Sequence, residues 1–143
     1  MKIIIAADHA GFQLKEKIKR YIKELKYDTE DIGAFSEEPV DYPKIAKKAA
    51  EKVAKTKSKG ILICGSGIGM CITANKIKGI RAALCYDKYT AKVARDHNDA
   101  NILCLGARTE SSKDYKNIIK TWLETEFSKE ERHKRRVKEM NEL

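Results

Sequence analysis

The chain has 143 residues, and its 30 Lys and Arg against 21 Asp and Glu give a formal net charge of +9 at pH 7. A chain of this length forms one domain, residues 1–143, and buries roughly 70% of its unfolded surface, so it needs no disulfides. There is no run of about 18 apolar residues and no secretion signal, which excludes a membrane-spanning protein and predicts a cytoplasmic one without a membrane partner.

Apolar runs of strand length alternate with stretches of helical periodicity along the whole chain. The sequence predicts, in order, strand 2–7, helix 12–25, a weaker edge strand 27–32, helix 42–56, strand 60–64, helix 68–77, strand 80–85, helix 89–96, strand 102–105 and helices 113–127 and 130–140. This order predicts an α/β fold, a three-layer Rossmann-like domain with a five-stranded parallel sheet and an extra C-terminal helix. The strand order does not follow from the spacing.

Parallel sheets of this kind bind ligands beyond the carboxyl ends of their strands. The segments that follow the first, third, fourth and fifth strands are residues 8–11, 64–69, 86–87 and 106–108. If the first and third strands are neighbours, Asp8, His9 and Cys64 share one crevice.

Residues 64–69 read Cys-Gly-Ser-Gly-Ile-Gly, a thiol at a strand end followed by three glycines. Glycines let backbone N–H groups approach a ligand closely, and the helix that begins near Ile68 adds its positive end. The segment is neither a G-x-G-x-x-G fingerprint nor a P-loop. It predicts chemistry on a small anionic molecule, with a merely packed Cys64 as the alternative.

Two other classes of function remain open at this point. The four cysteines include no C-x-x-C pair and no zinc-ligand spacing, so no metal site is predicted, and most of them are expected to be buried small hydrophobic residues. A thiol redox protein needs a resolving cysteine beside Cys64, and Cys71 lies about two helical turns away. The net charge and the basic run 132–136 suggest a nucleic-acid-binding module.

Several motifs in the same order resemble ribose-5-phosphate isomerase type B, and the likeness covers residues 1 to about 140. The matching segments are Asp8–Gly11, Cys64–Gly69, Asn75–Lys76, Gly79–Ala83, Ala94–Asn101, Leu105–Arg108 and Arg132–Arg136. The family also contains galactose-6-phosphate isomerase subunits and allose-6-phosphate isomerases, so a six-carbon sugar phosphate is the alternative substrate.

The resemblance implies that Cys64 abstracts a proton and that His97 helps to open the furanose ring. We also expect the hydroxyl of Ser66 to hydrogen-bond the Cys64 sulfur. The substrate-binding residues implied are Asp8, His9, Gly65, Ser66, Gly67, Ile68, Gly69, Asn98, Arg108, Arg132 and Arg136. Relatives without the thiol use a Glu where this chain has Met70, which places the chain in the thiol-base branch.

The resemblance further implies a homodimer or homotetramer with the active site between subunits, and the interconversion of D-ribose 5-phosphate and D-ribulose 5-phosphate in the non-oxidative pentose phosphate pathway. This reaction needs a base beside a carbonyl and donors for an enediolate oxygen, which the thiol and the loop amides can supply. No cofactor, metal or nucleic acid is expected.

Overall fold

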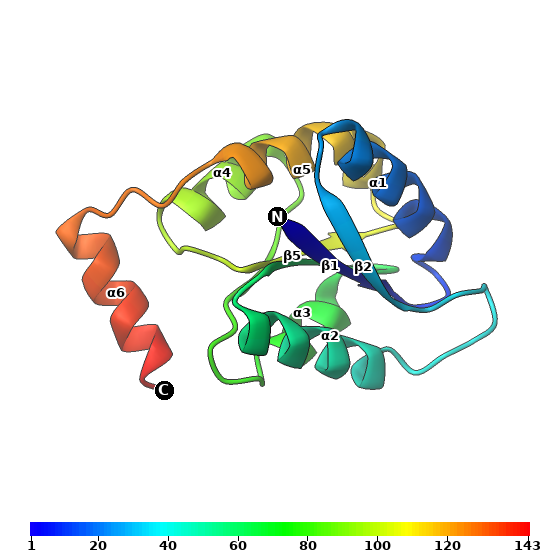
Figure 1. Cartoon of the computed structure of the whole chain (residues 1–143), viewed down its shortest axis with the longest axis horizontal. Coiled ribbons are helices and arrows are strands. Elements are labelled where there is room, and N and C mark those ends of the chain that lie inside the picture. The colour runs from blue at the N-terminus through cyan, green and yellow to red at the C-terminus, as the bar shows by residue number, and fades with distance from the viewer.

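The computed structural model describes residues 1–143 as a five-stranded parallel sheet between two layers of helices (Figure 1). The elements are β1 Lys2–Ala7, α1 Phe12–Glu24, β2 Asp28–Gly33, α2 Tyr42–Thr56, β3 Lys59–Cys64, α3 Ile68–Ala74, β4 Ala82–Leu84, α4 Lys88–Asp96, β5 Ile102–Gly106, the 3-10 helix η1 Glu110–Asp114, α5 Tyr115–Glu124 and α6 Glu131–Asn141. The predicted fold class is confirmed.

The strand order is β2-β1-β3-β5-β4, and every neighbouring pair is parallel. Strands β1 and β3 are therefore neighbours, so the segments that follow them meet at one edge of the sheet. Strand β2 lies at a sheet edge, as its weaker apolar pattern indicates.

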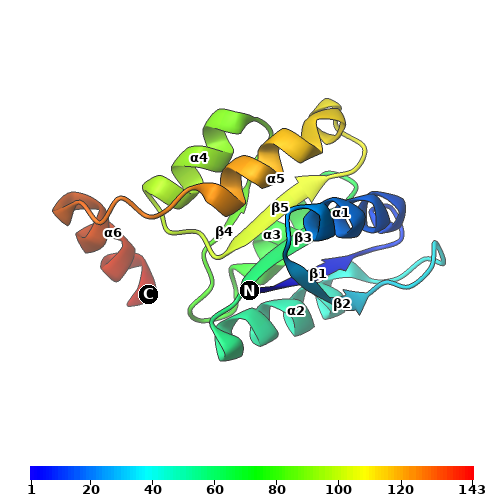
Figure 2. The ribbon, with the colours of Figure 1, turned by 45° about the horizontal axis from the view of Figure 1, so that its top comes forward.

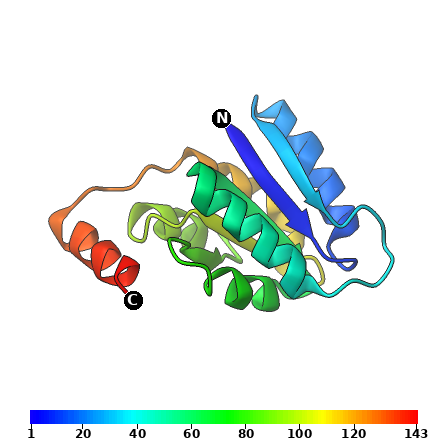
Figure 3. The same ribbon diagram turned by 60° about the horizontal axis from the view of Figure 1, so that its bottom comes forward.

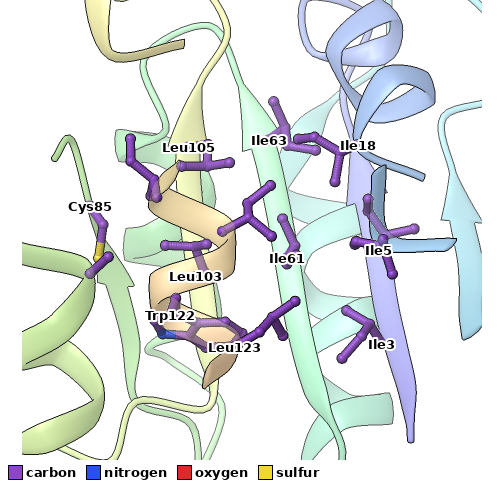
Figure 4. Packing of buried hydrophobic residues seen from close by; sticks show 14 of the residues in the cluster. Ile3, Ile5, Ile18, Ile61, Ile63, Cys85, Leu103, Leu105, Trp122 and Leu123 are labelled. Carbon is purple, nitrogen blue, oxygen red and sulfur yellow. The ribbon is translucent and has the colours of Figure 1, made fainter. Parts of the chain in front are cut away.

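Alternate residues of the strands point to opposite faces, as the two-residue period of a strand requires. On one face Ile3, Ile5, Ile61 and Ile63 pack against α1, α4 and α5 (Figure 2), and the close-up shows them with Trp122 and the other buried side chains of that cluster (Figure 4). Burial of a large apolar side chain contributes about 1.5–3 kcal/mol, so this face supplies much of the stability.

The opposite face of the sheet is covered by α2 and α3 (Figure 3). Helix α2 contributes Ala46, Ala49 and Ala50, all without exposed surface, together with Val53. Small side chains let the helix lie close to the strands. The start of α2 is thereby brought to the same edge of the sheet as the end of β3.

Three predicted elements are too long. Strand β4 begins at Ala82, because the amide of Ile80 bonds within a turn to Ile77 and that of Arg81 to the side chain of Asn101. Helix α3 ends at Ala74, where the chain enters the same turn. The predicted helix 113–127 is η1 followed by α5, which ends before Thr125 because that residue has an extended backbone.

Helix α6 stands away from the three layers at the end of an extended segment (Figures 1 and 3). It contacts the body through the buried His133 and Val137, and the Asn141 side chain accepts a 2.8 Å hydrogen bond from Arg81. Most of its other residues are exposed. None of the helices combines the length and the apolar character needed to cross a membrane.

Candidate active site

An open cleft of about 620 Å³ lies at the carboxyl ends of β1, β3 and β5. Its lining consists of Asp8, Tyr42, Cys64, Gly65, Ser66, Ile68, Gly69, Ile72, Arg108 and Thr109. Seven of the predicted site residues therefore meet in one place, because the parallel strands end at the same edge.

The thiol of Cys64 lies at the end of β3, with 5% of the residue exposed. The Gly67 amide donates a hydrogen bond to its Sγ at 3.1 Å. The predicted bond from the Ser66 hydroxyl to the sulfur is wrong, since no such bond forms. The Ser66 hydroxyl accepts a hydrogen bond from the Ile68 amide at 3.2 Å. The donor to the sulfur is therefore the backbone, whose direction the turn sets.

Backbone geometry explains the glycine at position 67. Its φ is +80°, and a Cβ there would lie 2.5 Å from Leu84 Cδ1. Only glycine takes this conformation without strain, and only glycine fits the space. In this conformation the Gly67 amide faces the Cys64 thiol and donates a hydrogen bond to it.

The loop after β5 is bonded to the loop after β3. The amide of Ala107 donates to the Cys64 carbonyl at 2.8 Å, and the amide of Arg108 donates to the Gly65 carbonyl at 2.9 Å. The Arg108 guanidinium lies against Gly65, where a Cβ would be 3.4 Å from its Nη1. These bonds place the positive charge of Arg108 beside Gly65, in the cleft that the thiol also lines.

Tyr42, Ile72 and Thr109 line the cleft but were not predicted as site residues. The Tyr42 ring packs on Gly69 so closely that a Cβ at residue 69 would lie 2.5 Å from the ring. The sequence offered only one signal, an aromatic residue at the start of α2 beside a proline, and that signal is also typical of an ordinary helix start.

Asp8 and His9 follow β1 directly and occupy different surroundings. Asp8 is buried, and its Oδ1 accepts from the Gly11 amide at 3.0 Å, so one oxygen holds the turn. The Nδ1 of His9 accepts from the Val40 amide at 3.2 Å. Asp8 lines the cleft, and His9 is held by the loop before α2.

The structure does not bring His97, Asn98, Arg132 and Arg136 to this cleft within one chain. Helix α4 runs back against the strand direction, so its C-cap His97 lies near the start of β5, at the opposite edge of the sheet. There the His97 ring stacks on His133 with the ring centres 4.4 Å apart. The predicted site residues thus form two separate groups.

The three cysteines outside the cleft have shifted pKa values. A hydrogen bond with the Cys104 thiol lowers the pKa of Cys71 to about 7, and the pKa of Cys104 rises because of this bond and its complete burial. Burial raises the pKa of Cys85 to about 12. Cys71 is only half-buried, but it does not line the cleft.

Residue 70 is a methionine, so no carboxylate at this position can replace the thiol as the base. Met70 is without exposed surface and packs with α2 and the sheet. Nor do three His, Cys, Asp or Glu side chains gather anywhere in the chain into a group that could hold a metal ion.

A parallel α/β sheet with polar side chains and a glycine loop gathered in a cleft at its carboxyl edge defines an α/β enzyme for small polar substrates. A family model described as Ribose/Galactose Isomerase matches residues 3–140. The chain belongs to the ribose/galactose isomerase family.

Relatives and solved structures agree with this assignment over nearly the whole chain. The chain is 46% identical over 129 residues to ribose-5-P isomerase B of Listeria innocua, covering 90% of this chain and 87% of that protein. The type B ribose 5-phosphate isomerase of Trypanosoma brucei superposes with a TM-score of 0.94 at 49% identity, covering 99% and 97% of the two chains. For the Mycoplasma genitalium ribose-5-phosphate isomerase B with bound ribulose-5-phosphate, the TM-score is 0.92 at 38% identity, covering 99% and 94%.

Proposed function

We propose that this protein interconverts D-ribose 5-phosphate and D-ribulose 5-phosphate through an enediolate, with Cys64 as the general base, in the non-oxidative pentose phosphate pathway. The observation that carries the proposal is the Cys64 Sγ at the strand end, in the cleft and 3.1 Å from the Gly67 amide. The relatives described as ribose-5-phosphate isomerase B support the choice of substrate.

The proposed reaction moves one proton between two neighbouring carbons. The Cys64 thiolate removes the proton from the carbon that bears the hydroxyl beside the carbonyl, and the electron pair of that C–H bond forms the double bond of the enediolate. The resulting thiol returns the proton to the former carbonyl carbon, while the proton of the neighbouring hydroxyl passes to the former carbonyl oxygen, so that a new carbonyl forms. The Gly67 amide donates a hydrogen bond to the Cys64 sulfur and so holds the reacting atom in the cleft.

The loop amides are the donors for the oxygen of the enediolate. Residues 65–69 turn around the end of β3, and the turn is fixed by the bonds from Ala107 and Arg108. A donor that is already aimed at a developing oxyanion contributes about 3–4 kcal/mol to the transition state. The Arg108 guanidinium beside Gly65 is suited to bind the phosphate.

The site is proposed to be completed by a second copy of the chain in a homodimer or homotetramer. His97, Asn98, Arg132 and Arg136 belong to the site by resemblance, yet in their own chain they lie away from the cleft. Helix α6 stands apart from the body (Figure 1), and both of its arginines named here are exposed. A symmetric partner would bring these residues to the cleft.

The test is turnover of purified protein with ribose 5-phosphate, allose 6-phosphate and galactose 6-phosphate in parallel. We expect ribose 5-phosphate to give the highest kcat/KM. Equal or better turnover of a six-carbon substrate would replace the substrate assignment by its alternative within the family. No turnover of any of the three, with steeply salt-dependent binding to unrelated oligonucleotides, would favour the nucleic-acid-binding alternative.

A further inference from the structure

Lys15 of α1 has no exposed surface, although its side chain carries a charge. Its Nζ donates to both carboxylate oxygens of Asp31, at 2.7 and 2.8 Å, and to the carbonyl oxygen of Ala34. Burying an ion pair costs several kcal/mol per ion, and apolar side chains of similar size are often as stable. Stability alone therefore does not account for the pair, and Lys15 also holds the backbone at Ala34.

That backbone is the loop 34–40 between β2 and α2, which is bonded at both ends to the segment that follows β1. At its first residue the Ala34 amide donates to the Ala7 carbonyl, while the Ala34 carbonyl accepts from Lys15. At its last residue the Val40 amide donates to His9 Nδ1 at 3.2 Å. Lys15 thus fixes the origin of a loop that ends on the imidazole.

The bond from Val40 decides which nitrogen of His9 carries the proton. A ring nitrogen that accepts a hydrogen bond has no proton of its own, so in this geometry the imidazole is neutral and its proton is on Nε2. A histidine held in this tautomer offers an N–H donor at Nε2 and no base there. This character suits a residue that binds an oxygen of an anionic substrate.

We propose that Lys15 is a positioning residue for His9: through Asp31 and the loop 34–40 it keeps His9 in the Nε2–H tautomer, which donates a hydrogen bond to an oxygen of the sugar phosphate. The identity of that ligand rests on the proposed function, whereas the tautomer and its dependence on Lys15 do not.

The tautomer can be read directly by NMR of ¹⁵N-labelled protein. The chain has three histidines, and the signals that disappear in a His9→Gln variant identify His9. We expect the two-bond ¹H–¹⁵N pattern of the Nε2–H form in the wild-type protein. In Lys15→Met we expect a mixture of tautomers, and a KM for ribose 5-phosphate about tenfold higher with kcat changed less than about threefold.

Lys19→Met is the matched control. Lys19 lies on the same helix and also bonds Asp31, at 2.9 Å, but its other hydrogen bonds go to Glu16 and none goes to the loop. We expect its His9 pattern and KM to match those of the wild type. A stability effect acting through Asp31 alone would instead appear in both lysine variants.

A second pair of variants tests the loop without disturbing the buried ion pair, and decides the matter if Lys15→Met does not fold. Val40→Pro removes the donor N–H, whereas Val40→Ala keeps it. We expect the proline variant alone to mix the tautomers and raise KM.

A wild-type His9 that is protonated on Nδ1 would overturn the proposal, as would an Nε2–H pattern that persists in a folded Lys15→Met. If Lys15→Met does not fold, persistence of that pattern in Val40→Pro would overturn it. A changed tautomer with an unchanged KM would overturn the part of the proposal in which His9 Nε2–H binds the sugar phosphate. If the wild type shows the Nε2–H form and the variants lose it, but no sugar phosphate is turned over, the proposed function fails and the positioning role of Lys15 stands.

Discussion

Leu84 packs so closely on Gly67 that a Cβ at residue 67 would lie 2.5 Å from Leu84 Cδ1. Strand β4 and the loop after β3 therefore constrain each other, although β5 lies between the strands β3 and β4 in the sheet. Since the Gly67 amide is also the donor to the Cys64 sulfur, this contact connects packing to the proposed chemistry.

Gly67→Ala is expected to reduce both stability and turnover. The variant must adopt a φ of +80° and displace Leu84, so we expect a loss of more than about 1–2 kcal/mol together with a lower kcat. Urea unfolding and initial rates measure the two effects. Gly79→Ala is the control, because residue 79 has a similar φ of +85° but open space around it, and it should lose stability only. Equal effects of the two variants on kcat would contradict the assigned role of the 67 amide.

Cys64→Ser is expected to reduce kcat by roughly 10²–10⁴-fold, the contribution typical of a general base, because a hydroxyl is a far weaker base at neutral pH. Cys71→Ser should keep kcat near the wild-type value, even though Cys71 has the pKa lowered to about 7. Steady-state kinetics of both variants decide whether position in the cleft or a lowered pKa better indicates which cysteine is the general base. Loss of turnover in Cys71→Ser, with turnover retained in Cys64→Ser, would show that Cys71 and not Cys64 is the base.

Mixing two inactive variants tests whether the site lies between subunits. Cys64→Ser and His97→Asn are each expected to be nearly inactive alone. If the two residues of one site come from different chains, random mixed dimers have native sites at about a quarter of all positions, and activity returns to about that fraction. The mixture is unfolded, refolded and assayed, with each variant refolded alone as the control. A mixture no more active than its components would refute the shared site.

Acid should weaken the buried ion pair of Lys15. Burial alone raises the pKa of Asp31, but the hydrogen bonds from Lys15, Lys19 and the Gly33 amide outweigh it, so the pKa lies below its usual value. A carboxyl with a lowered native pKa contributes stability that is complete above the unfolded pKa, near 3.9, and is lost as the pH falls through the native value.

The expected result is a difference in unfolding free energy between wild type and Asp31→Asn that is constant at neutral pH and shrinks below about pH 4. Urea titrations over this pH range measure it, with Asp28→Asn as the control, because Asp28 lies on the same strand but is exposed. A difference that does not depend on pH would show that the loss comes from packing alone.

Local sequence determined the elements and the glycine loop that lines the cleft. Apolar periodicity is set by burial, so it predicted five strands and six α-helices in the right order, and the thiol followed by glycines marked the cleft. The periodicity overestimated the lengths of β4 and α3. The hydrogen bonds at their ends involve Asn101 and the turn 75–80, and apolar periodicity does not report such bonds.

Only the tertiary structure decided what depends on contacts between distant residues. The order of the strands placed Asp8 beside Cys64, the direction of α4 put His97 at the far edge of the sheet, and the packing of α2 brought Tyr42 onto Gly69. Residue patterns report burial and local backbone preference, whereas the partner of a side chain depends on which elements the fold places side by side. For this reason the hydrogen bond expected from Ser66 to the Cys64 sulfur is absent, while the amide of Gly67 in the glycine loop donates to it.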